Sequence, residues 1–253
     1  VGSLFFKVDY PGLGPTFPLP LGGGRPEHYR QIAEYCCRHQ MPVSFCPIPR
    51  EELDRLQAFF PNSAAVSNRD SFDYLYRAED LQYFRGKKLS GQRNHVNKFL
   101  KTYGSWSFED LTQEQVPEVL EFLDRYAAGR EKAAPSFHEE LAKNREVLEH
   151  LSTYDMKGGV LRVEGKIAGF SLGEVVGDTL FTHIEKADRD YEGCYQMLVA
   201  QFAQRFAGGT AAFINREDDA GDLGLRASKL RYQPVALLEK FIVTIEDPCA
   251  VQR

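Results

Sequence analysis

Two side chains that can exchange protons lie close together in the segment THIEKA, at His183 and Glu185. The composition around them predicts a β-strand, in which side chains two residues apart face the same side of a sheet. A carboxylate or imidazole there can take a proton from an attacking amine. We therefore take both as candidate catalytic residues. The alternative is that Glu185 forms a salt bridge with Lys166 or Lys186.

A second polar group follows the strand predicted at 210–215 and precedes a helix predicted from Leu223. Its members are Asn215, Arg216, Glu217, Asp218 and Asp219. The three acids can bind the ammonium of an aminoacyl group or of an amine acceptor, with Glu217 as a third candidate catalytic residue, and Asn215 and Arg216 can contact an acyl carbonyl. The alternative is that the acids stabilise the N-terminus of the helix. Adjacent carboxylates without a neighbouring histidine are not spaced for chelation, so no metal site is predicted.

A third group is a cluster of positive charge. Between Asp80 and Glu109 the sequence has no acidic residue and six basic ones: Arg85, Lys87, Lys88, Arg93, Lys98 and Lys101. Apolar residues recur with a helical period over 88–103, which predicts an amphipathic helix. Its polar face, with Arg93, Asn97, Lys98 and Lys101, is predicted to bind a polyanion, either tRNA or an anionic lipid headgroup. The alternative is an ordinary solvated face.

The composition of the whole chain is that of a globular protein. The 253 residues are 43% hydrophobic and 26% charged, which excludes disordered and fibrous classes. The net charge of −5 argues against a generally basic nucleic-acid coat, and without the six clustered cations the rest carries 25 basic and 36 acidic residues. The chain starts inside a strand-like run at Val1, which indicates a fragment with a missing N-terminus.

The cellular location is predicted from apolar runs and cysteines. No apolar run approaches the ~18–20 residues that span a bilayer, and no signal peptide leads the chain. The five cysteines, Cys36, Cys37, Cys46, Cys194 and Cys249, are odd in number and form no C-x-x-C pair. We therefore predict reduced thiols and a cytoplasmic protein, with peripheral membrane contact as an extension.

The elements that position these groups follow a recognisable order. After the basic helix, the patterns predict a strand at 106–111, helices at 113–128 and 136–151, and strands at 159–163, 167–176 and 180–187. A helix at 193–206, a strand at 210–215, a helix at 223–232 and an extended stretch at 235–245 complete the chain. An antiparallel meander that passes into a helix and a further strand is the order of the GNAT acyltransferase fold. The first part, with nine of thirteen prolines in 61 residues, is expected to be built differently, from strands at 4–10 and 42–48, helices at 26–37 and 51–60, and an extended stretch at 64–76.

Three segments carry a family resemblance. YLYRAEDLQYFRGKKLSGQRNHVNKFLKTY (74–103), HIEKADRDYEG (183–193) and NREDDAGDLGLRASKLRYQP (215–234) resemble an uncharacterised bacterial family that is itself similar to the C-terminal domain of phosphatidylglycerol lysyltransferase. The resemblance implies an α+β fold of two tandem GNAT-like domains. These are a partial first domain at 1–80, a basic connecting helix at 81–104 and a second domain at 105–253. In the better-known relatives this domain moves an aminoacyl group from charged tRNA to a lipid headgroup.

The donor is constrained by one departure from the GNAT pattern. A glycine-rich loop ordinarily holds the pyrophosphate of CoA at a helix N-terminus, but here the equivalent place is Asp190-Tyr191-Glu192-Gly193. We therefore predict transfer of an acyl or aminoacyl group to an amine or hydroxyl of a small acceptor. Acetyl-CoA is disfavoured as donor, and both a different acyl-CoA and an aminoacyl-tRNA remain possible donors. The rival hypothesis is a non-catalytic polyanion-binding module on the same fold.

Overall fold

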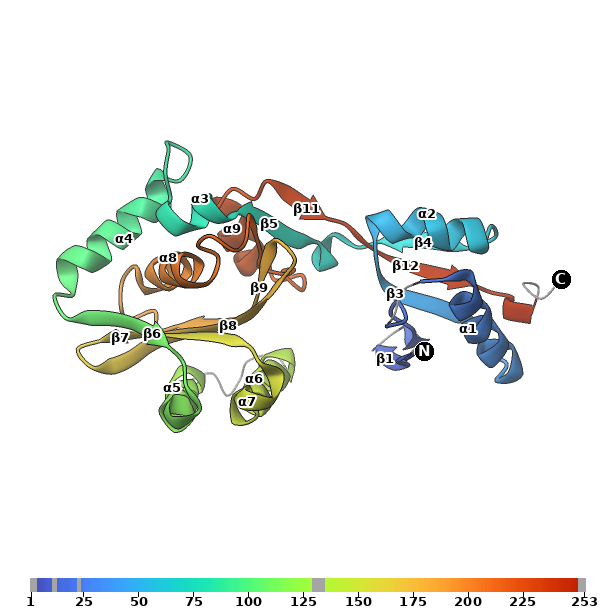
Figure 1. The fold of residues 1–253 in the computed structure, drawn as a ribbon, viewed down its shortest axis with the longest axis horizontal. Coiled ribbons are helices and arrows are strands. Elements are labelled where there is room, and N and C mark those ends of the chain that lie inside the picture. Colours follow the sequence, from blue (N-terminus) through green and yellow to red (C-terminus); the bar gives the residue numbers. More distant parts are fainter. Residues whose placement is uncertain (1–3, 11–12, 22–23, 129–134, 250–253) are drawn as a thin grey trace. The chain divides into compact units, whose positions relative to one another are not determined.

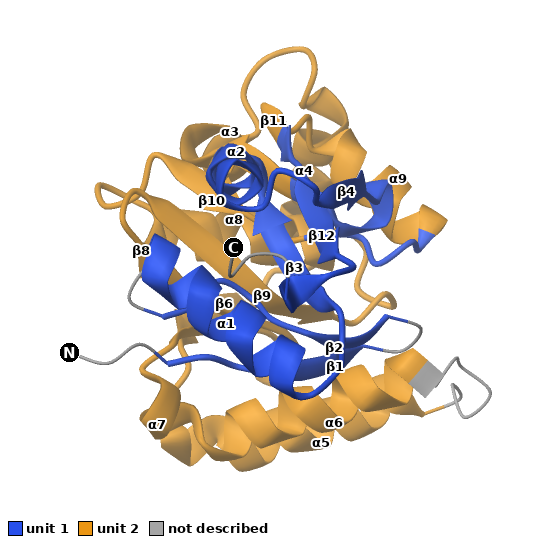
Figure 2. Cartoon of the chain, turned by 90° about the vertical axis from the view of Figure 1, so that its right-hand side faces the viewer, with its two compact units in different colours: residues 1–73, 218–222, 237–253 blue, residues 74–217, 223–236 orange. Residues whose placement is uncertain are grey.

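The computed structural model describes residues 4–10, 13–21, 24–128 and 135–249 (Figure 1). The chain forms two compact units (Figure 2). Unit 1 comprises Val1–Asp73, Asp218–Asp222 and Leu237–Arg253, and unit 2 comprises Tyr74–Glu217 and Leu223–Ala236. Within the described residues, no helix combines the length and apolarity that crossing a membrane requires.

Unit 1 is built on a three-stranded antiparallel sheet in the order β3 (Val43–Pro49), β12 (Lys240–Ile245) and β4 (Ala64–Ser67). Its remaining elements are β1 (Val8–Tyr10), β2 (Gly14–Thr16), α1 (Pro26–Arg38), α2 (Arg50–Phe59) and a short 3-10 turn at Arg69–Ser71. Apolar side chains of α1, α2 and the sheet form one core, with Tyr29, Phe45 and Leu56 fully buried.

The cysteine prediction is wrong for one pair in unit 1. Cys37 and Cys249 form a disulfide, whereas Cys36, Cys46 and Cys194 are free. The partners are 212 residues apart in the sequence. The fold brings them together, and neither spacing nor local composition carries that information.

Unit 2 contains most of a seven-stranded sheet in the order β11-β5-β10-β9-β8-β7-β6. The strands are β5 (Asp73–Arg77), β6 (Trp106–Asp110), β7 (Lys157–Val163), β8 (Lys166–Val176), β9 (Thr179–Ala187), β10 (Phe213–Asn215) and β11 (Ala236–Leu238). The helices are α3 (Ala78–Tyr83), α4 (Ser90–Thr102), α5 (Val116–Ala127), α6 (Pro135–Glu149), α7 (Leu151–Tyr154), α8 (Cys194–Phe206) and α9 (Leu223–Arg231). Helix α8 covers one face of the sheet and helices α5–α7 cover the other (Figure 1).

The predicted meander β7-β8-β9 is confirmed, including its two tight turns. Gly165 and Gly177 have φ of +77° and +61°, a left-handed conformation that glycine adopts without steric cost. The α+β fold class is confirmed as well. Helix α3 was not predicted, and the extended stretch at 235–245 is two strands in two different sheets.

The borders of the units differ from those predicted. Strand β12, near the end of the chain, belongs to unit 1 because it pairs with β3 on one side and β4 on the other. Helix α4 belongs to unit 2, where its fully buried Phe99 packs in a cluster with Met197 and Leu198 of α8. Both placements depend on contacts between distant segments, which local composition does not encode.

Candidate functional site

The parallel strands β9 and β10 run together for only part of their length. They pair at Phe213 with Thr179, Ile214 with Leu180, and Asn215 with Phe181. Strand β10 then ends, while β9 continues to Ala187. Among the described residues, no strand therefore lies beside the β10-facing edge of β9 beyond Phe181, and Arg216 is the first residue after β10 ends.

A β-bulge at His183 sets which side chains enter this place. Leu172 pairs with Ile184 and Gly173 pairs with Thr182, so His183 has no residue opposite it. An extra residue in one strand reverses the alternation of side chains beyond it. Thr182 and Glu185 consequently line one cavity on the α8 side, and Ile184 packs with α5 and α6. The prediction that His183 and Glu185 share a face is wrong for this reason.

Glu185 forms a nearly buried ion pair with Arg216. Glu185 Oε1 accepts a 2.8 Å hydrogen bond from Arg216 Nη2, and the two side chains are 13% and 9% exposed. The guanidinium lies 4.5 Å from the ring centroid of Tyr232 and 5.8 Å from that of Tyr76. Burial raises the pKa of Tyr232 to about 12, an effect that Arg216 partly offsets, so this phenol keeps its proton at neutral pH. Neither predicted lysine partner is used: Lys186 binds Glu140 instead.

One nitrogen of this guanidinium is left open. Arg216 Nη1 is buried and has no hydrogen-bond partner among the described residues. A buried donor without a partner costs about 1–3 kcal/mol, so such a position favours a bound acceptor. Arg216, Glu185 and Thr182 line a cavity of about 10 Å³. That is room for roughly one water.

The backbone that carries Arg216 is held from three sides. Asn215 Oδ1 accepts a 2.7 Å hydrogen bond from the N–H of Glu217, and the N–H of Tyr74 donates to the carbonyl of Glu217. The buried Lys229 of α9 donates through Nζ to the carbonyls of Arg216 and Glu217 at 2.5 and 3.3 Å. Asn215 thus shapes the turn, although it was expected to contact an acyl group.

His183 belongs to a separate, more exposed cluster. Its Nδ1 lies 2.7 Å from Glu217 Oε1 and its Nε2 lies 3.2 Å from Glu174 Oε1. The hydrogen bond to Glu217, followed by the charges of both carboxylates, raises the pKa of His183 against the opposing effect of burial. Sequence reasoning missed Glu174, which no motif marks.

This cluster predicts a pH-dependent stability. Since the pKa of His183 is higher in the folded protein than the ordinary 6.5, its stabilisation is complete below pH 6.5 and is lost as pH rises through the folded pKa. We expect urea unfolding between pH 6 and about 9 to show this loss in the wild type and not in His183→Gln. His95→Gln, which changes an exposed histidine of α4, is the control. A loss that persists in His183→Gln would contradict the assignment.

Asp218 and Asp219, which were expected to bind an ammonium group, each lie near a cation of the protein instead. Both belong to unit 1. Asp219 is fully buried and lies 3.3 Å from Arg69 Nη1, and Asp218 Oδ2 lies 3.9 Å from Lys240 Nζ. A carboxylate already neutralised by a cation is poorly prepared to bind an ammonium group, so we exclude both from the site.

Some of the basic side chains of α4 already have partners within the protein, and others are exposed. Arg93 Nη1 donates to the carbonyls of Phe84 and Gly86, and Lys98 forms a 2.6 Å ion pair with Glu192 in which both side chains are about half exposed. Asn97 and Lys101 are exposed, as are Lys87 and Lys88 just before the helix. We call Lys87, Lys88, Asn97, Lys98 and Lys101 the basic surface.

Helix α4 also covers the place where a CoA pyrophosphate would be expected. Gly193, at the start of α8, has φ of +82°, and a Cβ added there would lie 2.3 Å from the carbonyl oxygen of His95 in α4. The N–H of Glu192 donates to the hydroxyl of Tyr103 at 3.0 Å. The N-terminus of α8 is therefore packed against protein. Among the described residues, no group of three or more His, Cys, Asp or Glu is arranged to hold a metal ion.

Comparisons with known proteins agree with this architecture. A crystal structure of a conserved protein of unknown function from Bacteroides thetaiotaomicron superposes with a TM-score of 0.88 at 29% identity, covering 96% of this chain and 83% of that one. The C-terminal domain of a putative lysylphosphatidylglycerol synthetase from Agrobacterium fabrum gives 0.70 at 16% identity, covering 99% and 84%. An uncharacterised protein of Mycoplasmoides gallisepticum is 24% identical over 209 residues, 77% of this chain and 68% of that protein.

The family model described as phosphatidylglycerol lysyltransferase, C-terminal, matches residues 3–244, nearly the whole sequence. The resemblance inferred from the three sequence segments is thereby confirmed. The chain belongs to the family of phosphatidylglycerol lysyltransferase C-terminal domains.

Proposed function

We propose that this protein transfers an aminoacyl or acyl group to an amine or hydroxyl acceptor at the point where β9 and β10 part. The observation that carries the proposal is the buried Glu185–Arg216 pair with its open Nη1. A carbonyl oxygen placed at Nη1 would receive a charge-assisted hydrogen bond as it gains negative charge during attack. Glu185 Oε2 has no hydrogen bond within the described part of the chain and is the group proposed to take the proton of the nucleophile.

The donor that we propose is an aminoacyl-tRNA, and family membership supports it over acyl-CoA. The packed N-terminus of α8 leaves no helix end for a pyrophosphate. The acceptor that we propose is the headgroup of an anionic lipid, the substrate class in the family's description.

Acetyl-CoA is accordingly expected to bind weakly. Calorimetric titration of the chain with acetyl-CoA should give no heat that saturates below about 1 mM, where the binding free energy would be about −4 kcal/mol. Titration with aminoacyl-tRNA serves as the positive comparison at the same salt concentration. A micromolar dissociation constant for acetyl-CoA would require about −8 kcal/mol and would contradict this choice of donor.

We further propose that the polyanionic substrate docks on the basic surface. Changing Lys87, Lys88 and Lys101 together to Gln should make tRNA binding less dependent on salt. The negative slope of the logarithm of the binding constant against the logarithm of the salt concentration should become shallower by about two to three units, because each lost phosphate contact removes nearly one. Arg93 is left unchanged because it supports the backbone at Phe84 and Gly86. The matched control changes three exposed cations elsewhere in unit 2, Lys157, Lys166 and Arg189. Equal slopes for the two triple variants would make the basic surface an ordinary solvated face.

A non-catalytic polyanion-binding module is the second candidate function. It is favoured by the pairing of Asp218 and Asp219 with cations and by a cavity that holds only about one water. Such a module would bind tRNA or anionic vesicles with the same salt dependence and would transfer nothing. Polyanion binding by a chain that never yields aminoacylated product would support it.

A further inference from the structure

A second hollow in unit 2 lies at the other end of β10 from Arg216. It has a volume of about 320 Å³ and lies where β5 ends, β10 begins and α8 runs into a turn. Four of the residues that line it are Ala207, Gly209, Ala211 and Ala212, whose side chains are too small to fill the space. A volume just above 300 Å³ is at the small end of ligand pockets, so it suits a small molecule.

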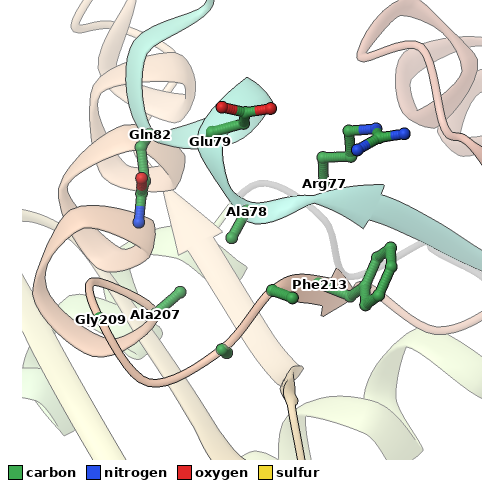
Figure 3. A pocket seen from close by; sticks show the side chains of 9 residues that line it. Arg77, Ala78, Glu79, Gln82, Ala207, Gly209 and Phe213 are labelled. Atoms are coloured by element: carbon green, nitrogen blue, oxygen red, sulfur yellow. The ribbon is translucent and has the colours of Figure 1, made fainter.

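The rim of this pocket carries one charge of each sign. Arg77 and Glu79 are both exposed, and neither forms an ion pair with the other or with any further residue that the structure describes. Figure 3 shows the side chains of Arg77 and Glu79 on the opposite side of the backbone from the methyl group of Ala78, and Gln82 reaching from α3 toward the turn at Ala207 and Gly209. Gln82 Nε2 donates to the carbonyl of Ala203, which leaves Gln82 Oε1 as an available acceptor.

An apolar wall completes the pocket. Phe213 pairs with Arg77 across β10 and β5, and Ala78, Ala207 and Ala211 also line the pocket. The pocket thus presents a cation, an anion and a neutral acceptor, together with alanine methyl groups and an aromatic ring beside Arg77. A ligand that matches it carries a negative group, a positive group and an apolar part within a few ångströms of one another.

We propose that this pocket binds a free α-amino acid with an apolar side chain. Its carboxylate pairs with the guanidinium of Arg77, which can hold both oxygens. Its ammonium group, which has donors and no acceptor, pairs with Glu79 and Gln82 Oε1. The side chain lies against Phe213 and the alanine methyl groups.

This site is distinct from the proposed transfer site. The carboxyl group of an aminoacyl donor is esterified and carries no charge, so such a donor cannot pair with Arg77 as a carboxylate does. Arg216 and Glu185 do not line the pocket. The inference therefore does not depend on the proposed transfer activity.

Calorimetric titration of the whole chain with L-leucine tests the site. We expect saturable binding to the wild type, and affinity reduced about tenfold or more in Arg77→Gln and in Glu79→Gln, because each removes a charge-assisted hydrogen bond. Ala212→Leu, at an exposed position of the lining, should abolish binding without changing a charge. Arg189→Gln and Glu121→Gln, at exposed positions outside the pocket, should bind as the wild type does.

Three further ligands decide which chemistry is recognised. L-leucinamide lacks the carboxylate and N-acetyl-L-leucine lacks the ammonium group, so both should bind at least about tenfold more weakly than L-leucine. Phosphoethanolamine carries the charges of a lipid headgroup, and tighter binding of it than of L-leucine would overturn the assignment to an amino acid. The absence of saturable binding at about 10 mM L-leucine, or equal affinity in Arg77→Gln, would overturn the site itself.

Discussion

Replacing Arg216 with methionine is expected to lower the free energy of unfolding by about 3–5 kcal/mol, because the change leaves a buried carboxylate without its partner. The partner is Glu185, which is 13% exposed. Guanidinium chloride unfolding followed by circular dichroism measures the effect. Replacing both members, in Glu185→Leu with Arg216→Met, should cost much less than the single change, since no unpaired charge is then buried.

Arg205→Met is the matched control for this experiment. Arg205 forms a 2.6 Å ion pair with Asp110 in which the side chains are 58% and 47% exposed. Loss of an exposed pair should cost at most about 1 kcal/mol. If Arg216→Met and Arg205→Met lowered the free energy of unfolding by the same small amount, the Glu185–Arg216 ion pair would not be buried in the folded protein.

Much of the fold could be predicted because its elements carry local signals. The turns at Gly165 and Gly177 mark the meander, and the apolar period over 88–103 marks α4. The family resemblance rests on local segments as well. The pairing of strand β12 with β3 and the disulfide of Cys37 with Cys249 depend on contacts between distant parts of the chain. No local sequence pattern predicts either of them.

The candidate site could be predicted by residue type but not by arrangement. Glu185 and Arg216 were both named from the sequence, but their pairing across 31 positions was not. The bulge at His183 separated two residues that simple alternation places together. Tyr76 and Tyr232, whose ring centroids lie 5.8 and 4.5 Å from the guanidinium, have no distinguishing motif.

Arg216→Lys is expected to reduce transfer by about 10²–10³-fold, the usual effect of removing a donor to the developing oxyanion. Lysine keeps the positive charge but loses the planar fork that reaches Glu185 while leaving Nη1 open. The expected loss is larger than any effect of the basic surface at saturating donor concentration, because that surface acts on binding. Arg205→Lys should leave the rate unchanged.

The most direct measurement is single-turnover transfer of label from aminoacyl-tRNA to vesicles of phosphatidylglycerol and phosphatidylcholine. Wild type, Arg216→Lys and Arg205→Lys are compared after equal tRNA binding has been verified. We expect labelled lipid to form with the wild type and with Arg205→Lys, and to fall by at least about 10²-fold with Arg216→Lys. Two results would contradict transfer at Arg216 and Glu185, where β10 ends beside β9. One is transfer by Arg216→Lys at the wild-type rate, and the other is the absence of labelled lipid from a wild-type chain that binds tRNA.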